Sequence, residues 1–254
     1  MKSQLIPSLL GVLLSTGLID TAVAQTISPI QISLLPNNVP AIGKVYLAGS
    51  DTQSQSYAAN QTNYKNIITS KVKEGVLFTG AGLNQLDPTR LYFWFDYTPR
   101  VYFIYGYAGY KDGLGATIAT VSTPTSQNLT GNTFTIFPNC HWNGATTRST
   151  TYPVLPGDFV QLPTVNAGQQ LAFFIYSNIQ NNGTASNIFY NGASNNVDNF
   201  QHMIAFFPDN SQYIIIGFED LLNGGDKDCN DLMFVVDIGP LNAAALRDAS
   251  SLPK

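Results

Sequence analysis

The chain has 254 residues, of which 11% are charged and 12% aromatic, with a formal net charge of −4. Mild acidity without a basic run argues against a nucleic-acid-binding role and against attachment to a membrane surface through basic residues. A surface built from hydroxyl and amide side chains instead of Lys and Glu favours an exported all-β protein over a helical cytosolic one.

The N-terminus has the pattern of a cleaved signal peptide. Lys2 supplies a positive charge, residues 5–19 are largely apolar, and residues 22–24 read Ala-Val-Ala. A signal peptidase recognises small residues in this spacing, so we predict a signal peptide over residues 1–24 and a mature chain from Gln25. The apolar stretch is too short and interrupted for a membrane span, and we expect none in the mature chain. The expected location is secreted, that is extracellular or periplasmic.

Strand signals dominate the remaining sequence. Residues 25–84 are predicted to be a β region of the same sandwich, followed by a sandwich domain over 85–240 and a C-terminal tail over 241–254. We find no helix of three turns after residue 25. Short β-branched and aromatic runs alternate with turn signals about every ten residues, which predicts an all-β, jelly-roll-like β-sandwich. The predicted strands are 45–48, 75–78, 91–95, 101–105, 116–121, 134–137, 159–162, 171–176, 203–207, 213–216 and 232–236.

The most informative stretch is an acidic segment between the last two predicted strands. Residues 219–231 contain five of the 16 carboxylates and a single basic residue, Lys227, so they carry the whole net charge. Crowded carboxylates repel, and a hard divalent cation with oxygen ligands relieves that repulsion. The stretch has no His, and Cys229 is an unlikely ligand, which argues against zinc or copper. We therefore predict calcium as the cofactor, with ligands from Glu219, Asp220, Asp226, Asp228, Asn230 and Asp231.

The spacing of Asp226, Asp228 and Asn230 is similar to the start of an EF-hand loop. An EF-hand needs Gly at its sixth position, where this chain has Asp231, and its twelfth position would fall beyond a predicted strand. The ligand set should instead close with Glu219 or Asp220 across the turn at Asn223. We expect residues 226–231 to be extended, so that alternation puts Asp226, Asp228 and Asn230 on one face, with Cys229 and Asp231 on the other. A solvated acidic turn and a catalytic carboxylate cluster stay open as alternatives.

Three residues near the acidic segment are candidates for supporting roles, and the two cysteines are a separate question. His202 follows Asp198 by four positions and is expected to orient a loop by hydrogen bonding, with action as a general base as the alternative. Asn223 is expected to support the acidic segment from its turn. Cys140 and Cys229 would enter an oxidising compartment, where they either form one disulfide or pack as two buried thiols.

Several ordered motifs resemble the bacterial extracellular domain of unknown function 4114. They are Gly-Phe-Glu-Asp-Leu at 217–221, Gly-Gly-Asp-Lys-Asp at 224–228 and Asn-Asp-Leu-Met-Phe at 230–234, with upstream motifs at 100–110 and 114–115. The resemblance implies a secreted or cell-surface β-sandwich with a calcium-binding or catalytic acidic motif. It brings no established activity. Cys229 departs from the aromatic residue usual in relatives, and Lys111-Asp112 from the usual Arg-Asn.

Three functions stay open at this point. The first is a non-catalytic, calcium-binding module that holds an extracellular glycan or cell-surface protein. The second is an extracellular hydrolase of glycosidase type, with two carboxylates of the acidic segment as acid and base. The third is a purely structural matrix or envelope component, for which calcium serves stability alone. No nucleophile–base arrangement is present, which favours the first over the second.

Overall fold

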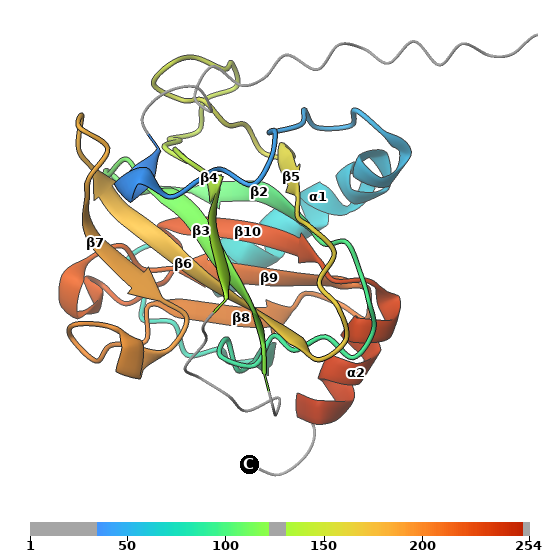
Figure 1. Ribbon diagram of the computed structural model, residues 1–254. Coiled ribbons are helices and arrows are strands. Elements are labelled where there is room, and N and C mark those ends of the chain that lie inside the picture. Colours follow the sequence, from blue (N-terminus) through green and yellow to red (C-terminus); the bar gives the residue numbers. More distant parts are fainter. Residues whose placement is uncertain (1–34, 122–130, 251–254) are drawn as a thin grey trace, which may run out of the picture.

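The computed structural model describes residues 35–121 and 131–250. The predicted signal peptide, residues 1–24, lies outside this range. Within the described residues, ten strands form two antiparallel sheets (Figure 1). The strands are β1 (Asn84–Leu86), β2 (Arg100–Gly106), β3 (Gly113–Thr120), β4 (Asn132–Phe137), β5 (Phe159–Gln161), β6 (Gln169–Ile179), β7 (Ala185–Tyr190), β8 (Met203–Phe207), β9 (Tyr213–Phe218) and β10 (Leu232–Asp237).

The two sheets form the predicted β-sandwich. One has the order β1-β8-β9-β10-β2-β5 and the other the order β4-β3-β6-β7. Their inner faces enclose an apolar core that includes Val101 and Phe103 of β2, Phe173 of β6 and Phe234 of β10. The all-β fold class is therefore confirmed.

The larger sheet is buried on both faces. Along β10, Leu232, Phe234 and Val236 enter the core between the sheets, whereas Met233 and Val235 belong to a second apolar cluster on the opposite face. Successive side chains of a strand point to opposite faces of the sheet. A strand that is covered on both faces, such as β10, therefore has apolar residues at every position.

Helix α1 (Thr52–Lys71) covers that opposite face, and Figure 1 shows it behind the larger sheet. Tyr57, Tyr64 and Ile68 lie on one side of the helix and pack in the second cluster. Asp51 caps the N-terminus, since its side chain accepts the Ser54 N–H at 2.8 Å. The prediction of a purely β region over residues 25–84 without a long helix is wrong. Amide and hydroxyl side chains fill most positions between these buried residues, so the sequence gives little helical periodicity in its apolar residues.

Several other segments differ from the predictions. Residues 240–250 form helix α2 (Pro240–Ser250), whose Ala243 and Leu246 enter the core, where a tail was expected. The predicted strands 45–48 and 91–95 are instead segments with isolated bridges, Tyr46 to Phe159 and Tyr92 to Gln170, and the predicted strand 75–78 is absent. Short 3-10 turns occur at Pro36–Asn38, Ala193–Asn195 and Leu222–Gly224. Within residues 35–121 and 131–250, neither helix has the length and apolar character to cross a membrane.

Candidate metal centre

The acidic segment connects the adjacent ends of β9 and β10. Phe218 and Leu232 pair directly across these strands, so residues 219–231 leave and re-enter the sheet at the same point. The backbone between them is curled, because Asn223, Gly224, Gly225, Lys227 and Cys229 have positive φ. The expectation of an extended stretch over residues 226–231 is wrong, and alternation does not separate Asp231 from Asp228.

The curl brings carboxylates into two groups that share one member. Oxygen atoms of Glu219, Asp228 and Asp231 lie within 4.8 Å of one another, and so do those of Glu74, Asp226 and Asp228. We call these the inner and the outer group. Glu219 and Asp228 are buried, whereas Glu74 and Asp226 are exposed.

Backbone donors fix the carboxylates of the inner group. Glu219 accepts the N–H groups of Leu221 at 3.3 Å and Lys227 at 3.1 Å. Asp228 accepts the Asn230 N–H at 3.0 Å, and Asp231 accepts the Asp220 N–H at 2.9 Å. These bonds orient the oxygens without adding positive charge.

No basic side chain neutralises either group among the ion pairs of the described residues. Lys227, the one base of the segment, lies over the ring of Phe200 at 5.7 Å. Burial, together with neighbouring carboxylates, raises the pKa of Glu219 to about 7 and that of Asp231 to about 9. Without a cation, Asp231 therefore favours the protonated form at neutral pH.

Asp220 belongs to neither group and instead faces Asp112, the residue before β3. Burial and the Asp112 carboxylate raise the pKa of Asp220 to about 9. Oδ1 of Asp112 accepts the Asn178 N–H at 2.9 Å. Oδ2 of Asp112 and Oδ2 of Asp220 are buried without a hydrogen-bond partner. Asp112 was not predicted as part of the site.

Asn230 lies beside both Glu74 and Asp228. Burial raises the pKa of each carboxyl group, and hydrogen bonding by the Asn230 side chain partly lowers it again. Its Nδ2 donates to the carbonyl oxygen of Val72 at 3.4 Å. Its Oδ1 is buried and has no partner. The structure thus places Glu219, Asp226, Asp228 and Asp231 in the two carboxylate groups, with Asn230 beside them, and their role as metal ligands stays a prediction.

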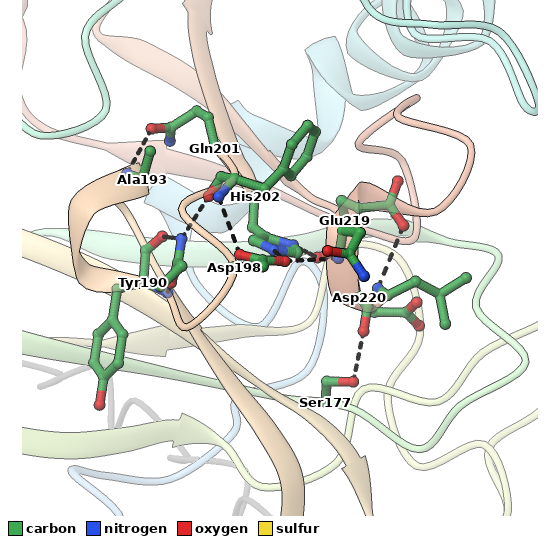
Figure 2. A network of polar contacts seen from close by, with 12 residues as sticks. Ser177, Tyr190, Ala193, Asp198, Gln201, His202, Glu219 and Asp220 are labelled. Atoms are coloured by element: carbon green, nitrogen blue, oxygen red, sulfur yellow. Dashed lines mark hydrogen bonds and ion pairs between the residues drawn. The ribbon is translucent and has the colours of Figure 1, made fainter.

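A buried network positions the inner group (Figure 2). His202, which precedes β8, donates from Nδ1 to the carbonyl oxygen of Glu219 at 2.9 Å. Its Nε2 lies 2.9 Å from Oδ2 of Asp198, which also accepts the Asn223 N–H at 2.6 Å. Phe189 stacks on the imidazole with ring centres 3.6 Å apart. Burial opposes ionisation of Asp198, but hydrogen bonds from Phe200, His202 and Asn223 lower its pKa to about 2. His202, Asp198 and Asn223 therefore orient the acidic segment.

The two cysteines are not bridged. Cys140 and Cys229 are free, buried thiols, and they pack in different apolar clusters, one between the sheets and one beneath α1. The structure therefore agrees with the second of the two expectations, two buried thiols, and not with a disulfide.

A family model described as "Domain of unknown function (DUF4114)" matches residues 165–239. The resemblance expected from the motifs is confirmed over this stretch, which includes the acidic segment and the His202 network but neither Glu74 nor Asp112. No curated protein and no solved structure matches the chain.

Proposed function

We propose that this chain is an exported, non-catalytic β-sandwich module that binds calcium through its acidic segment. The observation that carries the proposal is the inner group. Oxygens of Glu219, Asp228 and Asp231 lie within 4.8 Å of one another without a basic side chain among them.

The donor chemistry supports a hard cation. All charged donors are carboxylates, and the amide oxygen of Asn230 is buried without a partner, which suits a cation that takes six to eight oxygen ligands in irregular geometry. Burial raises the pKa of the neighbouring Cys229 thiol, which disfavours the thiolate that a softer metal would require. A bound calcium ion would supply charge neutralisation and rigidity to the segment. Glu219, Asp228 and Asp231 would hold it.

Burial favours binding over hydrolysis. A glycosidase needs an acid and a base that both reach the substrate across an open cleft. Glu219 and Asp228 are each only 1% exposed. A bound ion is small enough for such a site, whereas a glycosidic bond is not.

The partner we propose is an extracellular glycan or a cell-surface protein. The support is an exposed apolar surface next to the acidic segment: Leu221 is 41%, Leu222 47% and Val197 78% exposed. The Asn223–Asp198 hydrogen bond joins the loops that carry these residues. An ordered acidic segment would keep this surface in one conformation for its partner.

Calorimetric titration with calcium, combined with thermal unfolding, tests the metal proposal. Calcium at 100 times its dissociation constant should stabilise the fold by about 2.7 kcal/mol. Asp228→Ala should abolish this effect, whereas Asp96→Ala, which removes a carboxylate outside both groups, should preserve it. A melting curve that is the same in calcium and in chelator would contradict the proposal.

A further inference from the structure

A surface cavity of about 690 Å³ lies between helix α1, the turn that leads into β9, and helix α2. Its volume is within the range of roughly 300–1,000 Å³ that small-molecule sites occupy. β9 begins at Tyr213 and β10 ends at Asp237, so the cavity is at the opposite end of these strands from the acidic segment, which follows Phe218. The cavity is therefore separate from the candidate metal centre.

Neutral polar residues form most of the cavity lining. Of the described lining residues, three carry aliphatic hydroxyls and four carry side-chain amides, namely Gln53, Asn60, Asn210 and Gln212. Arg247 is the one charged residue among them. Its Nη1 donates to the carbonyl oxygen of Ser211 at 2.7 Å, and its guanidinium carbon lies 4.5 Å from the ring centre of Phe207. An apolar ligand would leave the amides of this lining without partners, which disfavours it.

A buried carboxylate beneath the cavity fixes two of the amides. Asp237, at the end of β10, is fully buried. Nε2 of Gln53 donates to its Oδ2 at 2.9 Å, and Nε2 of Gln212 donates to its Oδ1 at 2.9 Å and its Oδ2 at 2.8 Å. The Tyr97 hydroxyl and the Gly239 N–H also donate to Oδ1, at 2.9 Å and 3.0 Å. The orientation of both glutamines is therefore set from the interior.

The same contacts leave the two glutamine oxygens open to the cavity. A carboxylate accepts hydrogen bonds and does not donate them, so each glutamine directs its NH₂ group to Asp237 and its Oε1 away from it. No hydrogen bond to either Oε1 comes from a described residue, and neither atom is buried without a partner. Because both residues line the cavity, it holds two acceptors in fixed positions. Arg247 adds N–H donors beyond the one that Ser211 accepts.

A neutral ligand rich in hydroxyl groups matches this arrangement. A sugar hydroxyl both donates and accepts, so it can pair with a fixed amide oxygen and with a guanidinium N–H. Asp237 beneath the glutamines disfavours an anion, and Arg247 disfavours a cation. Pro240 and Tyr213 give the lining apolar surface, which suits the C–H face of a sugar ring.

We propose that this cavity binds a neutral saccharide unit of an extracellular polysaccharide, with Gln53 and Gln212 as acceptors and Arg247 as a donor. Asp237 is a positioning residue, since it holds both glutamines and is not among the lining residues. The site does not depend on calcium binding by the acidic segment. It is also distinct from the apolar surface that includes Leu222.

The experiment begins with the full chain on a glycan array. The array carries neutral oligosaccharides of hexoses and N-acetylhexosamines, together with oligosaccharides of uronic acids. The neutral class should bind. The neutral oligosaccharide with the strongest signal is then titrated by calorimetry against wild type and variants.

One pair of variants tests the cavity by filling it. Ser56→Trp places a large side chain in the cavity from an exposed position of α1 and should abolish binding. Ala58→Trp is the matched control, because this exposed residue is about 200° further round the helix axis and is not part of the lining. It should bind like wild type.

A second pair tests one acceptor. Gln53→Ala should weaken binding about three- to tenfold, because one hydrogen bond to the ligand is lost. Gln55→Ala removes an exposed amide of the same helix that does not line the cavity, and should leave the affinity unchanged. Circular dichroism and thermal unfolding check that each variant is folded.

Three results would overturn the proposal. They are an array without a neutral glycan bound, binding confined to uronic acids, and equal loss of binding in Ser56→Trp and Ala58→Trp. Glycan binding that Ser56→Trp leaves intact overturns the assignment to this cavity and directs attention to the surface beside the acidic segment. The calcium proposal is tested separately by its own titration.

Discussion

The side chains of His202 and Asp198 meet at 2.9 Å in the interior, although they are four positions apart on a loop. The same Asp198 oxygen accepts the N–H of Asn223. A single carboxylate therefore connects the start of β8 to the turn of the acidic segment, and the geometry of the candidate metal centre depends on it.

Asp198→Ala should destabilise the fold by about 2–4 kcal/mol, because it leaves His202 and two backbone N–H groups without an acceptor. Calcium affinity should fall with it. Asp96→Ala is the control, since Asp96 accepts one N–H, from Ala167, at the surface, and its loss should cost under about 1 kcal/mol. Denaturant unfolding and calcium titration measure both effects. Equal stability losses in the two variants would contradict the role given to Asp198.

Without divalent cations, the fold should be more stable in mild acid than in alkali. Burial, with neighbouring carboxylates, raises the pKa of Asp220 and of Asp231 to about 9 in the folded chain, against roughly 4 when unfolded. Between these values the folded chain binds more protons, so the free energy of unfolding falls as pH rises. Melting temperatures in chelator should decrease from pH 5 to pH 9, and saturating calcium should reduce the decrease, because Asp231 is a proposed ligand whereas Asp220 is not. An increase in chelator over this range would refute the prediction.

Gly225→Ala should weaken calcium binding roughly tenfold, or about 1.4 kcal/mol. Gly225 has φ +43°, and an added Cβ would lie 2.5 Å from Oε1 of Glu219. The substitution therefore displaces a proposed ligand and also strains the backbone. Gly144→Ala is the matched control, because its φ is +91° and its Cβ would meet no atom within 4 Å. Calorimetry should show normal calcium binding for the control, and a normal value for Gly225→Ala would argue against Glu219 as a ligand.

Asp51→Ala should destabilise the fold by about 1–2 kcal/mol, since it removes the N-terminal cap of α1 and a 2.9 Å ion pair with Arg100. Asp51→Asn keeps the capping oxygen and loses only the charge of a partly exposed pair, so it should cost about half as much or less. Thermal unfolding distinguishes the two. An Asn variant as unstable as the Ala variant would mean that the ion pair, not the cap, is the main contribution.

Both cysteines should resist thiol reagents in the native protein. Burial raises the pKa of Cys140 and that of Cys229, so neither forms a reactive thiolate at neutral pH. Thiol titration should find no reactive group in the native chain and two after denaturation, and a reducing agent should leave the melting temperature unchanged. A reductant-sensitive melting temperature would indicate a disulfide.

The sequence predicts the strands well where both faces are buried. β8 and β10 are short, almost wholly apolar runs, and the predicted boundaries match them to within a residue. Helix α1 was missed because its buried residues, Tyr57, Tyr64 and Ile68, are separated by amides and hydroxyls. β7 was missed because its Asn and Ser residues interrupt the apolar pattern. In both cases tertiary packing outweighs local preference.

The acidic segment was predictable as a cluster, because its members are neighbours in the sequence. Glu74 and Asp112 were not, since the fold brings them from distant segments; Gly75 and Asp228 are 153 positions apart. The arrangement within the segment was also beyond prediction, because Lys227 and Cys229 adopt left-handed conformations that L-residues seldom take.

The order of strands sets a lower limit on the size of any fragment that folds alone. Residues 165–239 contain β6 to β10, but β6 lies between β3 and β7, and β10 between β9 and β2. Excision of this stretch would leave both sheets with a long, bare, apolar edge, the feature that promotes aggregation. Expression of the family-matched stretch by itself should therefore give insoluble material, and a workable truncation has to start before β2.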